Sequence, residues 1–217
     1  MSKVIDVVWE FRYAYLSGLL VTLKICAVAW LGGLFGGVLI ALSAEWRPRL
    51  VGWPFLLLSR MTEAIPILVL LFWLHYPTQA ALGIVIDPFY TTAALLAVLN
   101  TLAVFGVLRN ALRGVPTEMI EAARVCGVRR TRIFWRIQFP IAFRSALGSL
   151  TSSQVQILQL SIFGGLISVG ELFRVSQRIN AQIYRPVEVY TGLGLFFLAV
   201  CLPLNIFAKH LEKRVRA

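Results

Sequence analysis

The sequence predicts an all-α integral membrane protein with five spans, and three observations lead to this fold class. The 217 residues are 59% hydrophobic and 14% charged, whereas soluble domains are about 45–50% apolar and about 25% charged. The mean hydropathy of +0.78 excludes a disordered chain and argues against a water-soluble enzyme. The apolar residues gather in five segments, each near the roughly 20 residues that cross a bilayer as a helix.

The first span is expected over residues 16–43, after an N-terminal segment at residues 1–15. Charged residues precede this apolar run, and the run is too long for the core of a cleavable signal peptide. Gly33 and Gly37 form a GxxxG spacing, which predicts that another helix approaches closely here. Lys24 interrupts the span, and we expect its ammonium group to reach outward to the membrane surface.

The second span is expected over residues 51–76, and it contains two charged residues and a proline. Arg60 and Glu63 are three positions apart, so they face the same side of a helix. Pro66 follows one turn later and predicts a broken helix, because proline removes a backbone hydrogen bond. Two interpretations of the charges remain open: a structural ion pair, or groups that line a polar path.

The remaining spans are expected over residues 89–108, 145–169 and 189–208, and a basic tail follows at residues 209–217. Polar side chains inside these apolar segments predict either hydrogen bonds between helices or the lining of a substrate path. The candidates for such a path, including those of the second span, are Arg60, Thr62, Glu63, Asn100, Gln154, Gln156, Gln159 and Ser161.

The distribution of charge predicts the orientation. Lys and Arg number 21 against 10 Asp and Glu, a formal net charge of +11. With five spans, Arg47, Arg49, the eight arginines of residues 109–144 and the basic tail fall on one side. Cytoplasmic loops collect Lys and Arg, so we expect this side and the C-terminus in the cytoplasm and the N-terminus outside. Because topology explains the charge, nucleic acid is not expected as a partner.

The loop at residues 109–144 contains a segment with strong helix signals. Thr117 is a suitable N-cap, and Glu118 and Glu121 lie early in the helix, where acidic residues are favoured. Gly127 is placed to end the helix in a left-handed conformation. One face carries mostly small side chains, which would let the backbone sink into a groove on a partner; it is formed by Met119, Ala122, Ala123 and Cys126.

A second short helix is expected from Thr131 to Phe139, ending before Pro140. Two short helices outside the membrane permit two interpretations. They form a docking device for a partner protein, or they lie on the lipid surface with their arginines facing phosphates.

The order Glu121-Ala122-Ala123, three residues, Gly127, nine residues, Ile137-x-Phe139-Pro140 resembles the EAA loop of ABC-importer permeases. Phe139 replaces the leucine of that family, which is a mild apolar change. The resemblance implies that the loop forms coupling helices seated in a cleft of a nucleotide-binding subunit. It assigns the coupling role to Glu121, Ala122, Ala123 and Gly127.

Further segments resemble the polar-amino-acid permeases of the histidine/glutamine type: residues 18–24, 66–69, 171–172 and 185–190, together with Arg109 and Val115-Pro116. The resemblance implies a five-span type I importer permease core at residues 16–208, in the bacterial inner membrane, with a periplasmic N-terminal segment. The implied partners are an ATPase subunit, a second permease copy or sister permease, a periplasmic substrate-binding protein and membrane lipid.

The sequence departs from this family around the expected path. Arg60 and Glu63 stand in the reverse order of the family's charges, and Gln159 and Leu160 stand where the fourth span usually has charged residues. Gly106 replaces a common acidic residue of the third span. We therefore expect ordinary energy coupling and unusual substrate handling, with an amino acid, an opine-like molecule or a compatible solute as substrate.

The chain has no G-x-x-x-x-G-K-[ST] phosphate loop, so ATP and Mg are expected on the partner subunit and no cofactor on this chain. Its cysteines are far apart and no Cys/His cluster occurs, so neither a metal site nor a disulfide framework is predicted. No residue is assigned a catalytic role. Two other classes remain as alternatives. One is a gradient-driven transporter that uses Lys24, Arg60 and Glu63, and the other is a membrane enzyme that uses His75 and His210.

Overall fold

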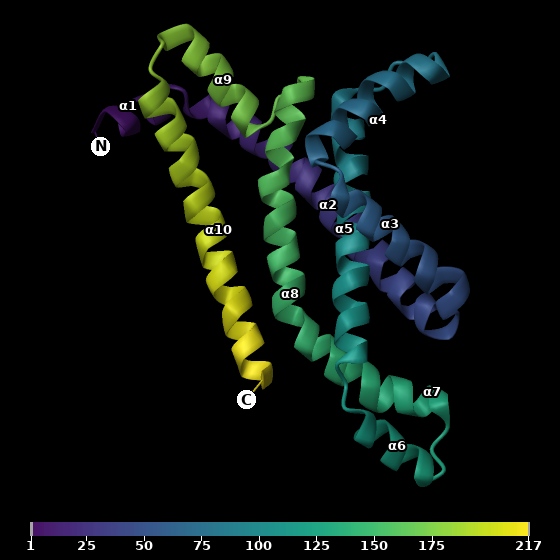
Figure 1. Cartoon of the computed structure of the whole chain (residues 1–217). Helices are drawn as coiled ribbons and strands as arrows, with labels where there is room; N and C mark the ends of the chain where they lie inside the picture. The colour runs from purple at the N-terminus through teal and green to yellow at the C-terminus, as the bar shows by residue number, and fades with distance from the viewer. Residues whose placement is uncertain (1, 217) are drawn as a thin grey trace.

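The structure is a computed structural model that describes the backbone of residues 2–216 and the side chains of residues 3–210. The described residues form helices and connecting turns, with no strand among them (Figure 1). Three helices are long and apolar enough to cross a membrane: α2 (Arg12–Trp46), α5 (Pro88–Arg113) and the Pro186–His210 part of α10 (Pro186–Arg216). Two bent helix pairs raise the number of candidate spans to five. The all-α membrane fold is thus confirmed.

Helix α2 follows the short helix α1 (Ser2–Glu10) and packs along α5 more extensively than any other pair of elements. Glycines make this approach close, because a Cβ atom at Gly33 would overlap the side chain of Asn100. A Cβ atom at Gly37 would similarly overlap Val104. The close helix packing predicted from the GxxxG spacing is confirmed.

The second predicted span is broken at Pro66, as expected. A π-helical turn, η1 (Pro48–Gly52), leads into α3 (Trp53–Ala64), and α4 (Ile67–Leu82) then leaves at an angle of 100°. Ile65 is extended, with φ −100° and ψ 127°, because the residue before a proline is sterically excluded from the helical region. The break therefore separates α3 and α4 into two helices with different directions, and they do not form one kinked helix.

Helix α5 begins at a side-chain cap and is longer than predicted. The Asp87 carboxylate accepts a hydrogen bond from the Phe89 backbone N–H at 2.7 Å, and Pro88 occupies the first turn. The helix continues past the predicted end of the span at residue 108 and stops at Arg113. A positive charge in the last turn is favourable for the helix dipole, and Leu112 in the added segment is buried.

Helix α6 (Thr117–Val125) is followed by a short turn. From Arg130 on, α7 (Arg130–Ile133), the π-helical turn η2 (Phe134–Gln138) and α8 (Phe139–Leu160) then follow one another without interruption. The prediction that a short helix ends before Pro140 is wrong. Proline interrupts a helix by removing a donor and crowding the carbonyl four residues earlier. Here the wider hydrogen-bond spacing of the π-turn precedes Pro140 and accommodates it in the first turn of α8.

The 3₁₀ segment η3 (Ser161–Ile167) extends α8, and α9 (Leu172–Ile183) follows at an angle of 50°. Figure 1 shows α9 at the end of the molecule opposite to α6 and α7. Helix α10 then returns along α8. The predicted tail at residues 209–217 begins within α10, and its side chains beyond His210 lie outside the described residues.

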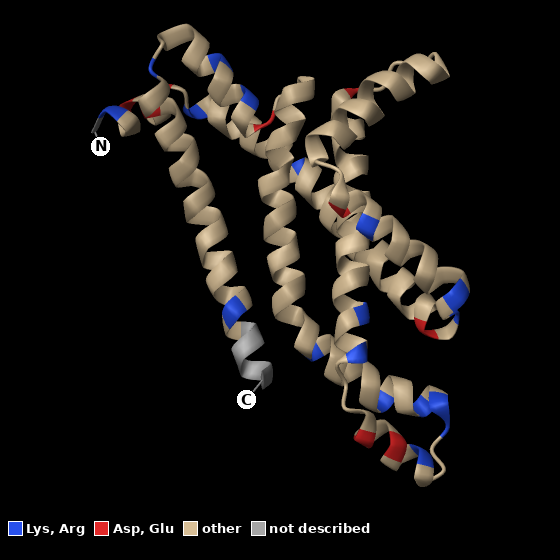
Figure 2. Ribbon diagram, in the orientation of Figure 1, with Lys and Arg blue, Asp and Glu red and all other residues tan. Residues whose placement is uncertain are grey.

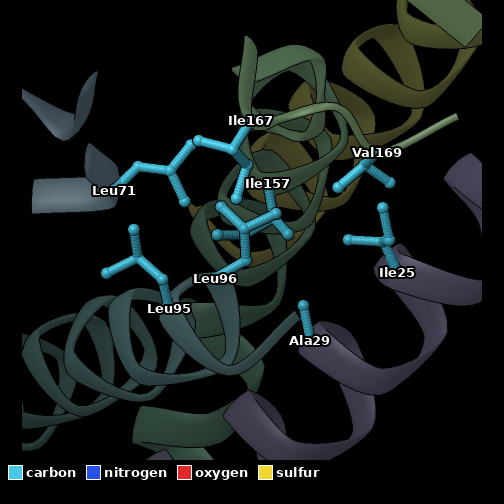
Figure 3. Packing of buried hydrophobic residues seen from close by; sticks show 8 residues of the cluster. All are labelled: Ile25, Ala29, Leu71, Leu95, Leu96, Ile157, Ile167 and Val169. Carbon is cyan, nitrogen blue, oxygen red and sulfur yellow. The ribbon is translucent and has the colours of Figure 1, made fainter. Parts of the chain in front are cut away.

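The largest buried cluster joins the broken second span to the long helices (Figure 3). Its side chains come from α2, α4, α5, α8 and the segment after it: Ile25, Ala29, Leu71, Leu95, Leu96, Ile157, Ile167 and Val169. Large apolar side chains also point outward, such as Leu31 and Phe35, which are both exposed over more than two thirds of their surface. Figure 2 shows few charges along the middle of α8 and α10, as expected for helices that cross a bilayer.

Candidate functional site

Helix α6 projects from the end of the molecule and has no buried residue (Figure 1). Glu121, Ala122 and Cys126 are exposed, Ala123 is partly exposed, and Met119 is 49% exposed. The face predicted from the helical spacing therefore lies open. Short side chains on an open face leave the helix backbone accessible to a partner surface.

The start of α6 differs from the prediction. Pro116 occupies the N-cap position, and the Thr117 side chain makes no capping hydrogen bond because Thr117 is already the first helical residue. Pro116, with φ −54° and ψ 126°, therefore sets the entry of the chain into the helix.

The prediction that Gly127 ends α6 in a left-handed conformation is confirmed. Gly127 has φ +74°, a conformation that is costly for residues with a Cβ atom. Its N–H donates to the Arg124 carbonyl at 2.9 Å, and the Val128 N–H donates to the Ala123 carbonyl at 3.1 Å. These two bonds form the Schellman motif that satisfies the last carbonyls of a helix. No other atom lies within 4 Å of a Cβ placed at Gly127, so conformation, and not space, requires the glycine.

A buried aromatic side chain connects α6 to the membrane helices. Phe134 in η2 is 2% exposed and clusters with Leu112 of α5 and Ala142 of α8. Ile120, the inward-facing residue of α6, packs against the same cluster. The Phe134 ring also meets the ring of Trp46 at the end of α2, edge to face, with centroids 5.7 Å apart. A displacement of α6 would therefore act on α2, α5 and α8 through close-packed side chains.

A second candidate site is a groove of about 430 Å³ between α3, α5 and α8. Three predicted path residues line it, and they are Thr62, Glu63 and Gln156. Two serines that were not predicted, Ser59 and Ser153, line it as well. Ser59 is four residues before Glu63 and Ser153 three residues before Gln156, so helical spacing was the signal that could have identified them. The apolar lining consists of Ile67, Leu99, Leu102, Ala103, Ile157 and Leu160.

Glu63 is held by a hydroxyl group and not by Arg60. The Ser59 hydroxyl donates to Glu63 Oε1 at 2.9 Å, and Arg60 is exposed outside the groove lining. Among residues 3–210, whose side chains are described, the ion pair within 4 Å is that of Arg130 with Glu45. The ion pair between Arg60 and Glu63, one of the two interpretations of these charges, is therefore not formed. The groove retains an acidic group with hydroxyl and amide groups near it.

Asn100 and Gln154 join helices and do not line the groove. Asn100 is fully buried and donates from Nδ2 to the Ala29 carbonyl and to Gln154 Oε1, both at 2.9 Å. Gln154 Nε2 donates back to Asn100 Oδ1 at 3.2 Å, and Trp30 Nε1 donates to the Gln154 carbonyl at 3.0 Å. Of the two interpretations of these amides, hydrogen bonding between α2, α5 and α8 is the one that the geometry supports.

The last two path candidates also lie apart from the groove lining. Gln159 is exposed. Ser161 is fully buried, and its hydroxyl donates to the Leu158 carbonyl at 2.7 Å, which satisfies it within its own helix. His75, considered for the enzyme alternative, is buried beside Thr91 and Gln79, with its Nδ1 atom 3.1 and 2.8 Å from their polar atoms.

A buried carboxylate fixes the far end of the molecule. Glu171 caps α9, with Oε2 accepting from the Phe173 N–H at 2.8 Å and Oε1 from the Arg174 N–H at 2.7 Å. The neighbouring Leu172 N–H donates to the Thr22 hydroxyl of α2 at 3.2 Å. A Cβ atom at Gly165 would overlap the Glu171 carboxylate, so only glycine fits there. Glu171 is therefore a structural cap.

Residues 33–217 match the family described as "Binding-protein-dependent transport system inner membrane component". The chain belongs to this family. The match includes α6, the Phe134 cluster and the groove. This membership identifies the chain as the membrane permease component of a transport system and gives no support to the gradient-driven alternative.

The permease has curated relatives that align over nearly its whole length. It is 28% identical to the octopine transport system permease protein OccM of Rhizobium meliloti, covering 94% of this chain and 84% of the relative. It is 26% identical to the glutamine transport system permease protein GlnP of Escherichia coli K12, covering 96% of each. It is 24% identical to the L-cystine transport system permease protein TcyB of Bacillus subtilis, covering 97% and 90%.

Solved structures show the same fold. An amino acid ABC transporter crystallised with histidines superposes with a TM-score of 0.85 at 24% identity, over 95% of this permease and 96% of that chain. An inward-facing MetNI methionine ABC transporter gives a TM-score of 0.74 at 19% identity, over 95% and 98%. The five-span importer core expected from the sequence is thus the fold of the permease.

Proposed function

We propose that this chain is the permease subunit of an ATP-driven importer that carries amino acids or amino-acid-like solutes inward across the bacterial inner membrane. Support for the substrate class comes from the relatives, which are named as permeases for octopine, glutamine and L-cystine. ATP and Mg would bind to a separate ATPase subunit. A second permease copy or a sister permease and a periplasmic substrate-binding protein would complete the transporter.

The observation that carries this proposal is the open face of α6 together with its buried connection to the spans. A partner ATPase would receive α6 in a cleft, with Glu121, Ala122 and Ala123 at the contact and Gly127 ending the helix. Movement of the ATPase would then reach α2, α5 and α8 through Phe134. Close packing supports this transmission, because packed interiors deform little and pass displacement on.

The orientation belongs to the same proposal. The basic end that carries α6 and α7 would face the cytoplasm, because Lys and Arg collect on that side of membrane proteins. The N-terminal segment and α9 would then face the periplasm, where a binding protein would deliver the substrate. Residues 1–15 would form the periplasmic segment, residues 16–208 the transport domain and residues 209–217 the cytoplasmic tail.

The experiment that tests ATPase docking is co-purification of the full chain from its native host in mild detergent. Wild type is expected to retain an ATP-hydrolysing subunit, and Glu121→Arg is expected to lose it, because the substitution reverses a charge at the contact. Glu10→Arg is the matched control, since Glu10 is an exposed glutamate on α1 and lies outside the segment from Thr117 to Phe139 that is proposed to dock. Retention of the ATPase by Glu121→Arg would contradict the assignment of this face.

We further propose that the groove between α3, α5 and α8 is this subunit's part of the substrate path. Its volume of about 430 Å³ falls within the range of small-molecule sites. Glu63 would attract the ammonium group of an amino acid, and Gln156 and Thr62 would hydrogen-bond its other polar groups. Arg60 and Gln159 are outside the groove lining, and we assign them no role in this path.

Uptake into proteoliposomes tests the groove, with labelled glutamine, cystine and octopine as probes. Glu63→Gln is expected to lower uptake of the transported probe about tenfold or more, since a hydrogen bond to a charged group is worth about 1.5–3 kcal/mol. Gln156→Ala is expected to lower it in the same direction. Gln159→Ala is the control on α8, and uptake equal to wild type is expected. If Glu63→Gln and Gln156→Ala transport normally, the path lies elsewhere.

A further inference from the structure

A polar pocket of about 190 Å³ lies where the ends of α2 and α5 meet η1 and α7. Three arginines and one carboxylate line it, and they are Arg109, Arg113, Arg130 and Glu45. We call it the arginine pocket. Small or apolar residues complete its lining: Ala41, Ala44, Pro48, Gly52 and Leu112. It is separate from the groove and from the open face of α6.

The positive charge of the arginine pocket is not balanced within the protein. Glu45 Oε1 lies 3.9 Å from Arg130 Nη2, which is a long ion pair on a side chain that is 68% exposed. Arg109 is partly buried and experiences the like charges of Arg113 and Arg60. Among residues 3–210, no carboxylate lies within ion-pair distance of Arg109 or Arg113. Two guanidinium groups therefore face the pocket without a counter-ion.

Neighbouring side chains place the pocket at the level of the lipid headgroups. Trp46 and Trp53, on either side of the turn beside the pocket, are 43% and 64% exposed. Tryptophan collects at the boundary between the bilayer and water. Leu50, in the same turn, is 74% exposed, and Arg49 next to it is also exposed. An exposed apolar side chain, Leu50, beside an exposed basic one, Arg49, fits a turn that contacts both lipid acyl chains and headgroups.

We propose that the arginine pocket binds the phosphate of an anionic phospholipid from the leaflet on the α6 side of the membrane. The planar guanidinium fork matches the geometry of phosphate oxygens. Basic pockets between membrane helices bind acidic headgroups, and each Lys or Arg near the surface adds to the attraction. The bound lipid supplies the missing counter-charge between α2, α5 and α7, and α2 and α5 also contribute side chains to the Phe134 cluster.

The test uses the full chain purified with the subunits that accompany it, titrated with dioleoyl phosphatidylglycerol or phosphatidylcholine and observed by native mass spectrometry. Wild type is expected to retain phosphatidylglycerol in preference to phosphatidylcholine. The double variant Arg109→Gln/Arg113→Gln is expected to bind phosphatidylglycerol about 30-fold more weakly, from the contribution of two arginines at a charged surface. Arg113→Gln alone, at an exposed position, is expected to give an intermediate loss and guards against misfolding of the double variant.

The matched control is Arg144→Gln/Lys209→Gln, which removes two exposed positive charges outside the pocket lining and is expected to leave the lipid affinity unchanged. If this control loses as much affinity for phosphatidylglycerol as the Arg109/Arg113 variant, net charge alone explains the binding and the proposed site is wrong. Displacement of the lipid by millimolar inorganic phosphate would assign the pocket to free phosphate instead. Loss of the ATPase subunit from the Arg109/Arg113 variant, with lipid retention unchanged, would assign the pocket to the protein partner and contradict the proposal.

Discussion

The docking end around α6 and the groove between α3, α5 and α8 differ in how the chain specifies them. The docking end is built from residues close in sequence, from Thr117 to Phe139, at the fixed spacings of helix turns and a glycine cap. The groove is built from single residues on separate helices, such as Glu63 and Gln156. A site built from one segment of the chain depends on local spacing, whereas a site built from separate helices depends on how those helices pack.

The comparison predicts that the docking end depends on its aromatic core for stability. Phe134→Ala removes a ring that is 2% exposed and is expected to lower the free energy of unfolding by about 3–5 kcal/mol, as for other buried aromatic residues. Thermal unfolding of the purified chain in detergent measures this. Trp135→Ala is the control, because the neighbouring ring is 51% exposed. Equal effects of the two substitutions would show that the cluster is not a packed unit.

Substitutions of Asn100 and Gln154 test whether these two amides join helices or line the substrate path. Asn100→Leu leaves Gln154 without its buried partner and is expected to cost about 1–3 kcal/mol of stability. Asn100→Leu/Gln154→Leu removes both members of the pair and is expected to recover part of that loss. The apparent unfolding temperature of each variant gives the comparison. If both variants keep wild-type stability and lose uptake, the amides belong to the path.

The glycine cap of α6 gives the smallest expected effect. Gly127→Ala places a Cβ atom at φ +74° and is expected to cost about 1 kcal/mol of local stability, with weaker retention of the ATPase subunit. Gly106→Ala in α5 is the matched control, because no atom lies within 4 Å of its added Cβ and its backbone is helical. Amide hydrogen exchange of α6 measures the difference. Identical exchange in both variants would contradict the role of the cap.

Much of the fold follows from the sequence because it depends on local signals. Apolar length predicted the spans, the GxxxG spacing predicted close packing, and Pro66 predicted the break in the second span. The continuous path from α7 through Pro140 into α8 could not be predicted, because a π-turn accommodates the proline and leaves no mark in the local pattern.

The candidate site divides in the same way. The face of α6 and the conformation of Gly127 follow from spacing alone. Whether a polar residue in a span lines a groove or joins two helices depends on which helix it faces. The sequence could not separate Glu63 from Asn100 for this reason, and it could not show that Ser59, and not Arg60, is the partner of Glu63.

The most direct test of the two-region account is a single reconstitution in which ATPase retention and substrate uptake are both measured for Glu121→Arg and for Glu63→Gln. The account predicts that Glu121→Arg loses the ATPase and therefore uptake. It predicts that Glu63→Gln keeps the ATPase and loses uptake alone. If Glu63→Gln also releases the ATPase, or if Glu121→Arg retains it and transports normally, docking and substrate passage are not divided between these two regions.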